Sequence, residues 1–151
     1  MKRLRNLCAA VLAAAFLFAL AGCSARTPIS ADDFKKQAEA QGFKVTDASG
    51  SSPTVEKYLD AVKSETGTDI IYLTFSSETS AQETYKTIKA NLSSGAGGTS
   101  KNVDSSSYNK YTLENGELCH TLVRMNKTIL YGKATTGHKN QVDDFIKAVK
   151  Y

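Results

Sequence analysis

The stretch Ile70-Ile71-Tyr72-Leu73-Thr74-Phe75 decides the fold of this chain. It consists of β-branched, aromatic and other apolar residues, a composition typical of a β-strand, and we predict a strand over 69–76. Successive side chains of a strand point to opposite faces of the sheet. We therefore expect Ile71, Leu73 and Phe75 to face the helices, and Tyr72 and Thr74 to face away from them.

The segment before this strand, 54–63, is compatible with two structures. Its apolar residues fit the spacing of a helix and also the alternation of a strand. We predict a strand, because Ser64-Glu65-Thr66-Gly67 then closes a hairpin into 69–76.

Two helices have recognisable starts in the sequence. Ser30 is an N-cap residue with Asp33 as its capping-box partner, and Gly42 suits the position just after the helix end. A second helix is predicted to begin near Ser80, with Glu83 three residues later in the same role. The glycine-rich segment 93–100 that follows predicts a loop. It lacks the sixth glycine of a dinucleotide-binding loop and follows a helix instead of a strand.

The second half of the chain repeats the plan of the first. Asn115-Gly116 favours a type I′ hairpin turn, and Asn126-Lys127 is a second tight turn. One or two strands are predicted over 102–113, followed by strands over 118–125 and 128–135 and a helix over 142–149 that reaches the C-terminus.

The alternating residues 43–47, after the first helix, predict a further strand. The predicted order is therefore α-β-β-β-α-β-β-β-α. Strands joined by hairpins pair antiparallel, and amphipathic helices must cover a sheet face. We predict an α+β domain in which an antiparallel sheet of about five to seven strands has helices packed on one face.

The amino-terminal segment has the three parts of a secretory leader. Residues 1–5 carry positive charge, 7–21 are apolar, and small residues follow. The leader ends in Leu20-Ala21-Gly22-Cys23, which resembles the lipobox of bacterial lipoproteins. This resemblance implies that the signal peptide is cut before Cys23, that the Cys23 thiol carries diacylglycerol, and that the new amino terminus is often acylated too.

The resemblance implies three parts: a signal peptide (1–22), a short tether (23–29) and one domain (30–151). Across nearly the whole mature chain, from the lipobox through Ile29-Ser30-Ala31-Asp32-Asp33-Phe34 to Tyr151, the sequence is similar to small lipoproteins of Gram-positive bacteria. That similarity brings no assigned activity or site residues. Residues 24–29 extend over about 20 Å at most, so we expect the domain to sit close to the outer face of the cell membrane.

Charge argues against a nucleic-acid partner. The chain has 19 Lys and Arg residues against 15 Asp and Glu. Lys2, Arg3 and Arg5 belong to the leader, which leaves 16 basic residues and a net charge of +1 in the mature chain. Phosphate backbones bind clustered surplus positive charge.

The cysteines and histidines do not indicate a catalytic or metal site. Cys119 is the thiol that remains beside lipidated Cys23, and its neighbour His120 must point to the opposite face of the same strand. We predict that Cys119 is a buried, small hydrophobic residue. No zinc-binding spacing is present, and no metal or cofactor is predicted.

Strand alternation places several side chains on the face that we expect to be uncovered. Tyrosine and arginine are favoured in interfaces, because they combine contact area with directional hydrogen bonds. We predict a non-enzymatic domain that binds an envelope protein or a small ligand; the alternatives are an envelope hydrolase and a structural or inhibitory module. The predicted binding face consists of Tyr58, Tyr72, Thr74, His120, Arg124, Tyr131 and Lys133.

Overall fold

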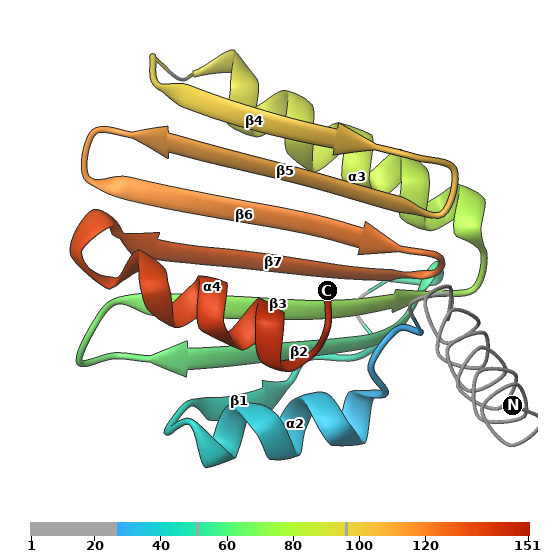
Figure 1. The fold of residues 1–151 in the computed structure, drawn as a ribbon. Helices are drawn as coiled ribbons and strands as arrows, with labels where there is room; N and C mark the ends of the chain where they lie inside the picture. Colours follow the sequence, from blue (N-terminus) through green and yellow to red (C-terminus); the bar gives the residue numbers. More distant parts are fainter. Residues whose placement is uncertain (1–26, 51, 96) are drawn as a thin grey trace, which may run out of the picture.

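The computed structural model describes residues 27–50, 52–95 and 97–151. The predicted signal peptide, the lipobox and Cys23 lie outside these residues. The predicted order of helices and strands is confirmed (Figure 1). The elements are α2 (Ala31–Ala40), β1 (Lys44–Asp47), β2 (Val55–Lys63), β3 (Thr68–Phe75), α3 (Glu78–Ser94), β4 (Thr99–Asp104), β5 (Tyr108–Asn115), β6 (Leu118–Met125), β7 (Thr128–Thr135), the 3-10 turn η2 (Thr136–His138) and α4 (Lys139–Ala148).

The seven strands form one sheet in the order β1-β2-β3-β7-β6-β5-β4, and every neighbouring pair is antiparallel. The β2–β3 hairpin and the β5–β6–β7 meander meet where β3 pairs with β7. Helix α3 crosses from the end of β3 to the edge strand β4. The apolar run Ile70–Phe75 therefore lies in the middle of the sheet.

The helices lie on both faces of the sheet, which corrects the prediction of a single covered face. Helices α2 and α4 pack on one face, where Ile70 and Tyr72 belong to their core. Helix α3 packs on the other face, against Phe75 and the half-buried Leu73. The reason lies in β3, which has apolar residues on both faces: Ile70 and Tyr72 on the α2–α4 side, and Leu73 and Phe75 on the α3 side.

Tyr72 is the clearest individual correction. Its side chain is only 2% exposed and lies among the aromatic rings of the α2–α4 core. The Phe34 ring centroid is 4.9 Å from that of Tyr72 and 5.3 Å from that of Phe145. The Tyr72 hydroxyl donates to the Ile29 carbonyl at 3.0 Å, and burial raises the Tyr72 pKa to about 12. Tyr72 is thus a core residue that fixes the approach of the chain to α2.

The local start and stop signals are mostly confirmed. The Asp33 amide donates to Ser30 Oγ at 3.1 Å, and Gly42 has the positive φ of +82° that its position requires. Helix α3 begins at Glu78, earlier than predicted, because Ser77 is the cap and accepts from the Ser80 amide at 3.0 Å. The ambiguous segment 54–63 is a strand, β2, as predicted.

The helices leave two parts of the sheet uncovered, one on each face. Helix α2 covers β1 and β2, and α4 covers β7, β3 and β6, so β4 and β5 remain open on that face. On the opposite face α3 lies over β6 and the neighbouring parts of β5 and β7, which leaves β2 and the adjoining parts of β3 and β7 open. The open areas are diagonally opposed across the sheet.

Within the described residues, no helix combines the length and the apolar character needed to cross a membrane.

Candidate functional site

The open area on the α3 side carries most of the predicted binding residues and is called here the open sheet surface. Strand register arranges its side chains in rows across the sheet. In one row Asp69 lies between Val62 and Lys133, and Lys133 lies opposite His120. The next row runs through Asp60, Ile71 and Tyr131. The open sheet surface consists of Tyr58, Asp60, Val62, Asp69, Ile71, His120, Tyr131 and Lys133.

Asp60 and Asp69 form a carboxyl pair on this surface. Burial, and then the hydrogen bond and repulsion from Asp60, raise the pKa of Asp69 to about 6, whereas the Lys133 ammonium opposes the rise. Asp69 is therefore protonated below about pH 6 and charged above it. Among the described residues, the solvent-inaccessible Oδ1 atoms of both side chains have no hydrogen-bond partner. Both residues are only partly buried, so the pair presents negative charge at this surface when Asp69 is ionised.

An aromatic pair stands beside the carboxyl pair. His120 Nδ1 and the Tyr131 hydroxyl are 2.8 Å apart, and the two rings are nearly parallel at 14°, with centroids 6.1 Å apart. Burial and the positive charge of Lys133 lower the pKa of His120, so the imidazole is neutral at pH 7. Burial, followed by the charge of Asp69, raises the pKa of Tyr131. The two rings hold each other in place and present a hydrogen-bonded edge.

Tyr58 borders the carboxyl pair from β2. Its ring is partly buried, and its pKa is raised by burial and then by the charges of Asp60 and Asp69. Protonated tyrosine hydroxyls at physiological pH can donate or accept hydrogen bonds. The surface thus combines two carboxyl groups, one ammonium group and three rings.

The predicted binding residues are not all together. Tyr58, Tyr131 and Lys133 lie partly exposed on the open sheet surface, and His120 is on the same face but only 8% exposed. Tyr72 and Thr74 lie on the α2–α4 face. Arg124 is on the α3 side but is only 1% exposed. Its side chain is therefore part of the packed interior, not of a surface.

Sequence reasoning missed the carboxyl pair. The position of Asp60 could have been predicted, because residues two apart on a strand share a face and Tyr58 was assigned to the binding face. Asp69 had none, because its proximity to Asp60 depends on the β2–β3 register.

Cys119 is buried and unpaired by disulfide, as predicted. It lies opposite Ala134 on the α4 side, and the sheet separates its thiol from the ring of His120. Across the described part of the chain, no group of three or more His, Cys, Asp or Glu side chains is arranged to hold a metal ion.

Comparisons with known proteins assign no activity. No protein-family model matches the sequence, and no curated protein matches it. A crystal structure of a GTP binding regulator from Thermotoga maritima is similar at 17% sequence identity, with a TM-score of 0.47. The alignment covers 80% of this chain and 84% of that one.

Proposed function

We propose that the protein is a lipoprotein anchored to the outer face of the cell membrane through Cys23, and that its domain is a non-enzymatic binding module. The lipobox-like Leu20-Ala21-Gly22-Cys23 at the end of an apolar leader supports the anchor. Two acyl chains hold a protein stably on a bilayer. The open sheet surface is then the part of the domain that engages a partner at the envelope.

The observation that carries the binding role is the unsatisfied carboxyl pair. A buried acceptor without a partner costs about 1–3 kcal/mol, and in Asp60 and Asp69 two such acceptors adjoin. An ammonium or guanidinium group of a partner is attracted to the two carboxyl groups and favours loss of the Asp69 proton. The adjacent rings of Tyr58 and Tyr131 supply apolar contact and a face for a cation.

Binding is favoured over catalysis by the position of the best nucleophile. Cys119 is 6% exposed and lies on the opposite side of the sheet from His120. A thiol activated by a base needs that base within hydrogen-bond reach. The pair Cys119-His120 therefore has no catalytic arrangement.

The test is a titration of the protein, held in neutral detergent, with a tetra-arginine peptide and followed by amide NMR shifts. We expect shifts at Tyr58, Ile71 and Lys133, larger at pH 7.5 than at pH 5, because the proton must leave the carboxyl pair. The double substitution Asp60→Asn with Asp69→Asn should abolish them.

The matched control removes two exposed acids elsewhere, Glu39→Gln and Asp144→Asn, with the same change in net charge. It should bind like the unaltered protein. Equal loss in both variants would mean that the peptide responds to net charge, and equal retention would mean that the carboxyl pair is not the site. Either result contradicts the proposed binding surface.

A further inference from the structure

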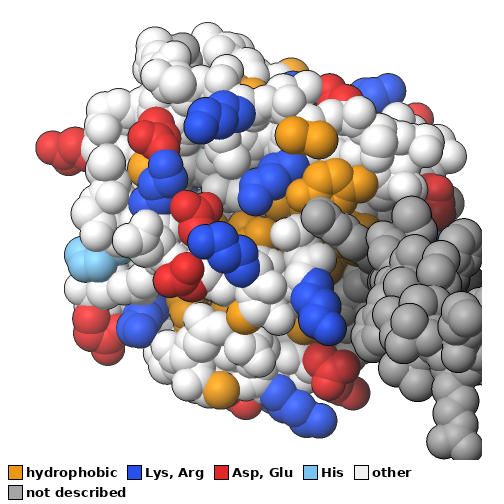
Figure 2. Space-filling view, in the orientation of Figure 1, with side chains coloured by type: hydrophobic (Ala, Val, Ile, Leu, Met, Phe, Trp, Pro, Cys, Tyr) orange, Lys and Arg blue, Asp and Glu red, His pale blue; other side chains and the backbone are white. Residues whose placement is uncertain are grey.

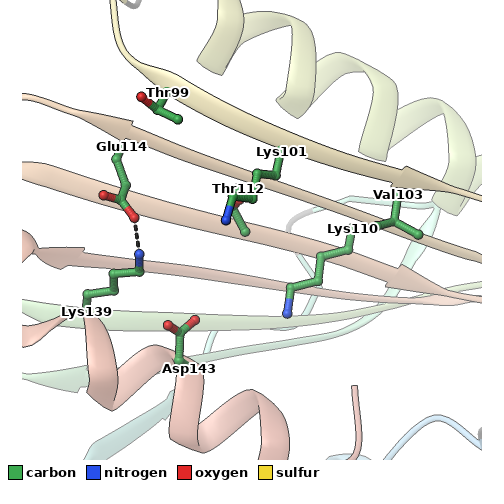
Figure 3. Close-up of a pocket in the computed structure, with 8 residues that line it drawn as sticks. All are labelled: Thr99, Lys101, Val103, Lys110, Thr112, Glu114, Lys139 and Asp143. Carbon is green, nitrogen blue, oxygen red and sulfur yellow. Dashed lines mark hydrogen bonds and ion pairs between the residues drawn. The ribbon is translucent and has the colours of Figure 1, made fainter.

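The second uncovered part of the sheet contains a hollow of about 300 Å³ beside α4 (Figure 3). Its floor is made by alternate side chains of β4 and β5, where Lys101 lies opposite Thr112 and Val103 lies opposite Lys110. Lys139 on α4 forms one wall. This hollow, called here the lysine hollow, lies on the opposite face of the sheet from the open sheet surface.

The charges of the lysine hollow are not evenly neutralised. Lys139 makes an ion pair with Glu114, and the charge of Asp143 also acts on Lys139. Both acids of the hollow are thus engaged at its α4 end. Within the described residues, Lys101 and Lys110 make no ion pair, and the three lysines of the hollow against its two acids leave a net charge of +1.

We propose that the lysine hollow binds a phosphate group, and that this group belongs to the head of an anionic membrane phospholipid. Ammonium groups act as point charges and suit a tetrahedral phosphate, whereas planar carboxylates are better matched by the fork of arginine. The hydroxyl of Thr112, between the lysines on the floor, adds a hydrogen-bond donor.

Two observations favour a lipid source over a free phosphate. The first is the exposure of Val103, which borders Lys110 and is 55% exposed, so the hollow has an apolar rim next to its positive floor. Figure 2 shows Lys side chains close to apolar ones on this face of the molecule. The second observation rests on the proposed anchor, since a tether that reaches about 20 Å keeps the domain at the bilayer surface.

The experiment titrates the protein in neutral detergent with dihexanoyl phosphatidylglycerol, dihexanoyl phosphatidylcholine and inorganic phosphate, and follows the amide shifts of β4 and β5. These soluble probes report on the hollow whether or not Cys23 carries lipid, so a failure here is distinct from a failure of the anchor. We expect saturable shifts at Lys101, Lys110 and Thr112 with the anionic lipid and at least about tenfold weaker binding of the zwitterionic one.

Lys101→Gln with Lys110→Gln should weaken binding of the anionic lipid by about tenfold or more. The control Lys36→Gln with Lys44→Gln removes the same charge from exposed positions on α2 and β1 and should leave affinity unchanged. Equal affinity of the hollow variant and the unaltered protein would overturn the site. Inorganic phosphate that binds as tightly as the anionic lipid would overturn the lipid source.

Discussion

At the scale of single residues, Arg124 shows how a charged side chain in a sheet becomes structural. Its Nε donates to Asn109 Oδ1 at 2.6 Å, and its two terminal nitrogens donate to the carbonyls of Asn126 (3.1 Å) and Ser106 (2.8 Å). These partners lie in β5 and in the loops that precede β5 and follow β6. Burial lowers the pKa of Arg124, and the charge of Glu78 opposes that effect. The guanidinium therefore ties one end of the sheet together.

Arg124→Met should destabilise the protein by about 2–4 kcal/mol, because the apolar chain fills the space but leaves buried Asn109 and two part-buried carbonyls without their donor. Urea unfolding measures the loss. Arg124→Lys should recover part of it, since one ammonium can reach fewer acceptors. A loss below about 0.5 kcal/mol for Arg124→Met would contradict this structural role.

Asp69 gives the domain a pH dependence of definite sign. Its pKa is about 6 in the folded protein against an ordinary value of 3.8, so the folded state binds the proton more tightly. The contribution of Asp69 to stability is therefore largest below about pH 4 and is lost as pH rises through 6. The pair is partly open to solvent, which reduces the expected effect to about 1 kcal/mol.

Asp69→Asn should raise the free energy of unfolding at pH 8 by about 1 kcal/mol and change it little at pH 4. The comparison is made between the two proteins at each pH, because His120, whose pKa is lowered, contributes a trend of opposite sign. An equal effect of Asp69→Asn at both pH values would show that the pKa of Asp69 is not raised in the folded protein.

At the scale of elements, β7 and α4 are joined by a close approach. Gly132 lies in the middle of β7, and a Cβ atom there would collide with the side chain of Val142 on α4. Its φ is not in the left-handed region, so space and not backbone conformation requires glycine at this position. The packing distance of α4 is thus set at one point of the central strand.

Gly132→Ala should destabilise the protein by about 1–3 kcal/mol through overpacking. Val142→Ala removes the methyl groups that collide, so the double variant should be more stable than the sum of the two single changes implies. Thermal or urea unfolding of the four proteins gives the coupling. If the effects of the two single changes on stability simply add, the contact with Val142 is not the reason for glycine at position 132.

The positions of the helices and strands were largely predictable from the sequence, whereas the burial of the side chains on each face of the sheet was not. Alternation, hairpin turns and caps are local signals, and they placed β6 and β7 at their observed boundaries. The pairing of β3 with β7 is not local, and it decides that Tyr72 is buried while Tyr131 is not. For the same reason four residues of the predicted binding face were brought together and the carboxyl pair was missed.

At the scale of the whole molecule, helices on opposite faces leave two open areas of different character. One carries Asp60 and Asp69, and the other carries Lys101 and Lys110, which make no ion pair among the described residues. A layer packed on a sheet lies about 10 Å from it. The two areas are on opposite faces, so the sheet itself separates them. In the proposed account, the lysine hollow meets the membrane and the open sheet surface remains available to a partner.

The two surfaces should act independently. Substituting Asp60 and Asp69 by asparagine should leave the affinity of the lysine hollow for dihexanoyl phosphatidylglycerol unchanged, because separated sites without shared partners are additive. NMR titration of the double variant checks this. A severalfold change in affinity would indicate that the sheet couples the two faces.

The most direct test of the lipoprotein assignment is the intact mass of the protein purified from its native membranes. The account predicts a chain that begins at Cys23 and carries a diacylglyceryl group on that sulfur, and a Cys23→Ser protein that lacks this mass increment. A native chain that retains Met1 and an unmodified Cys23 would contradict it.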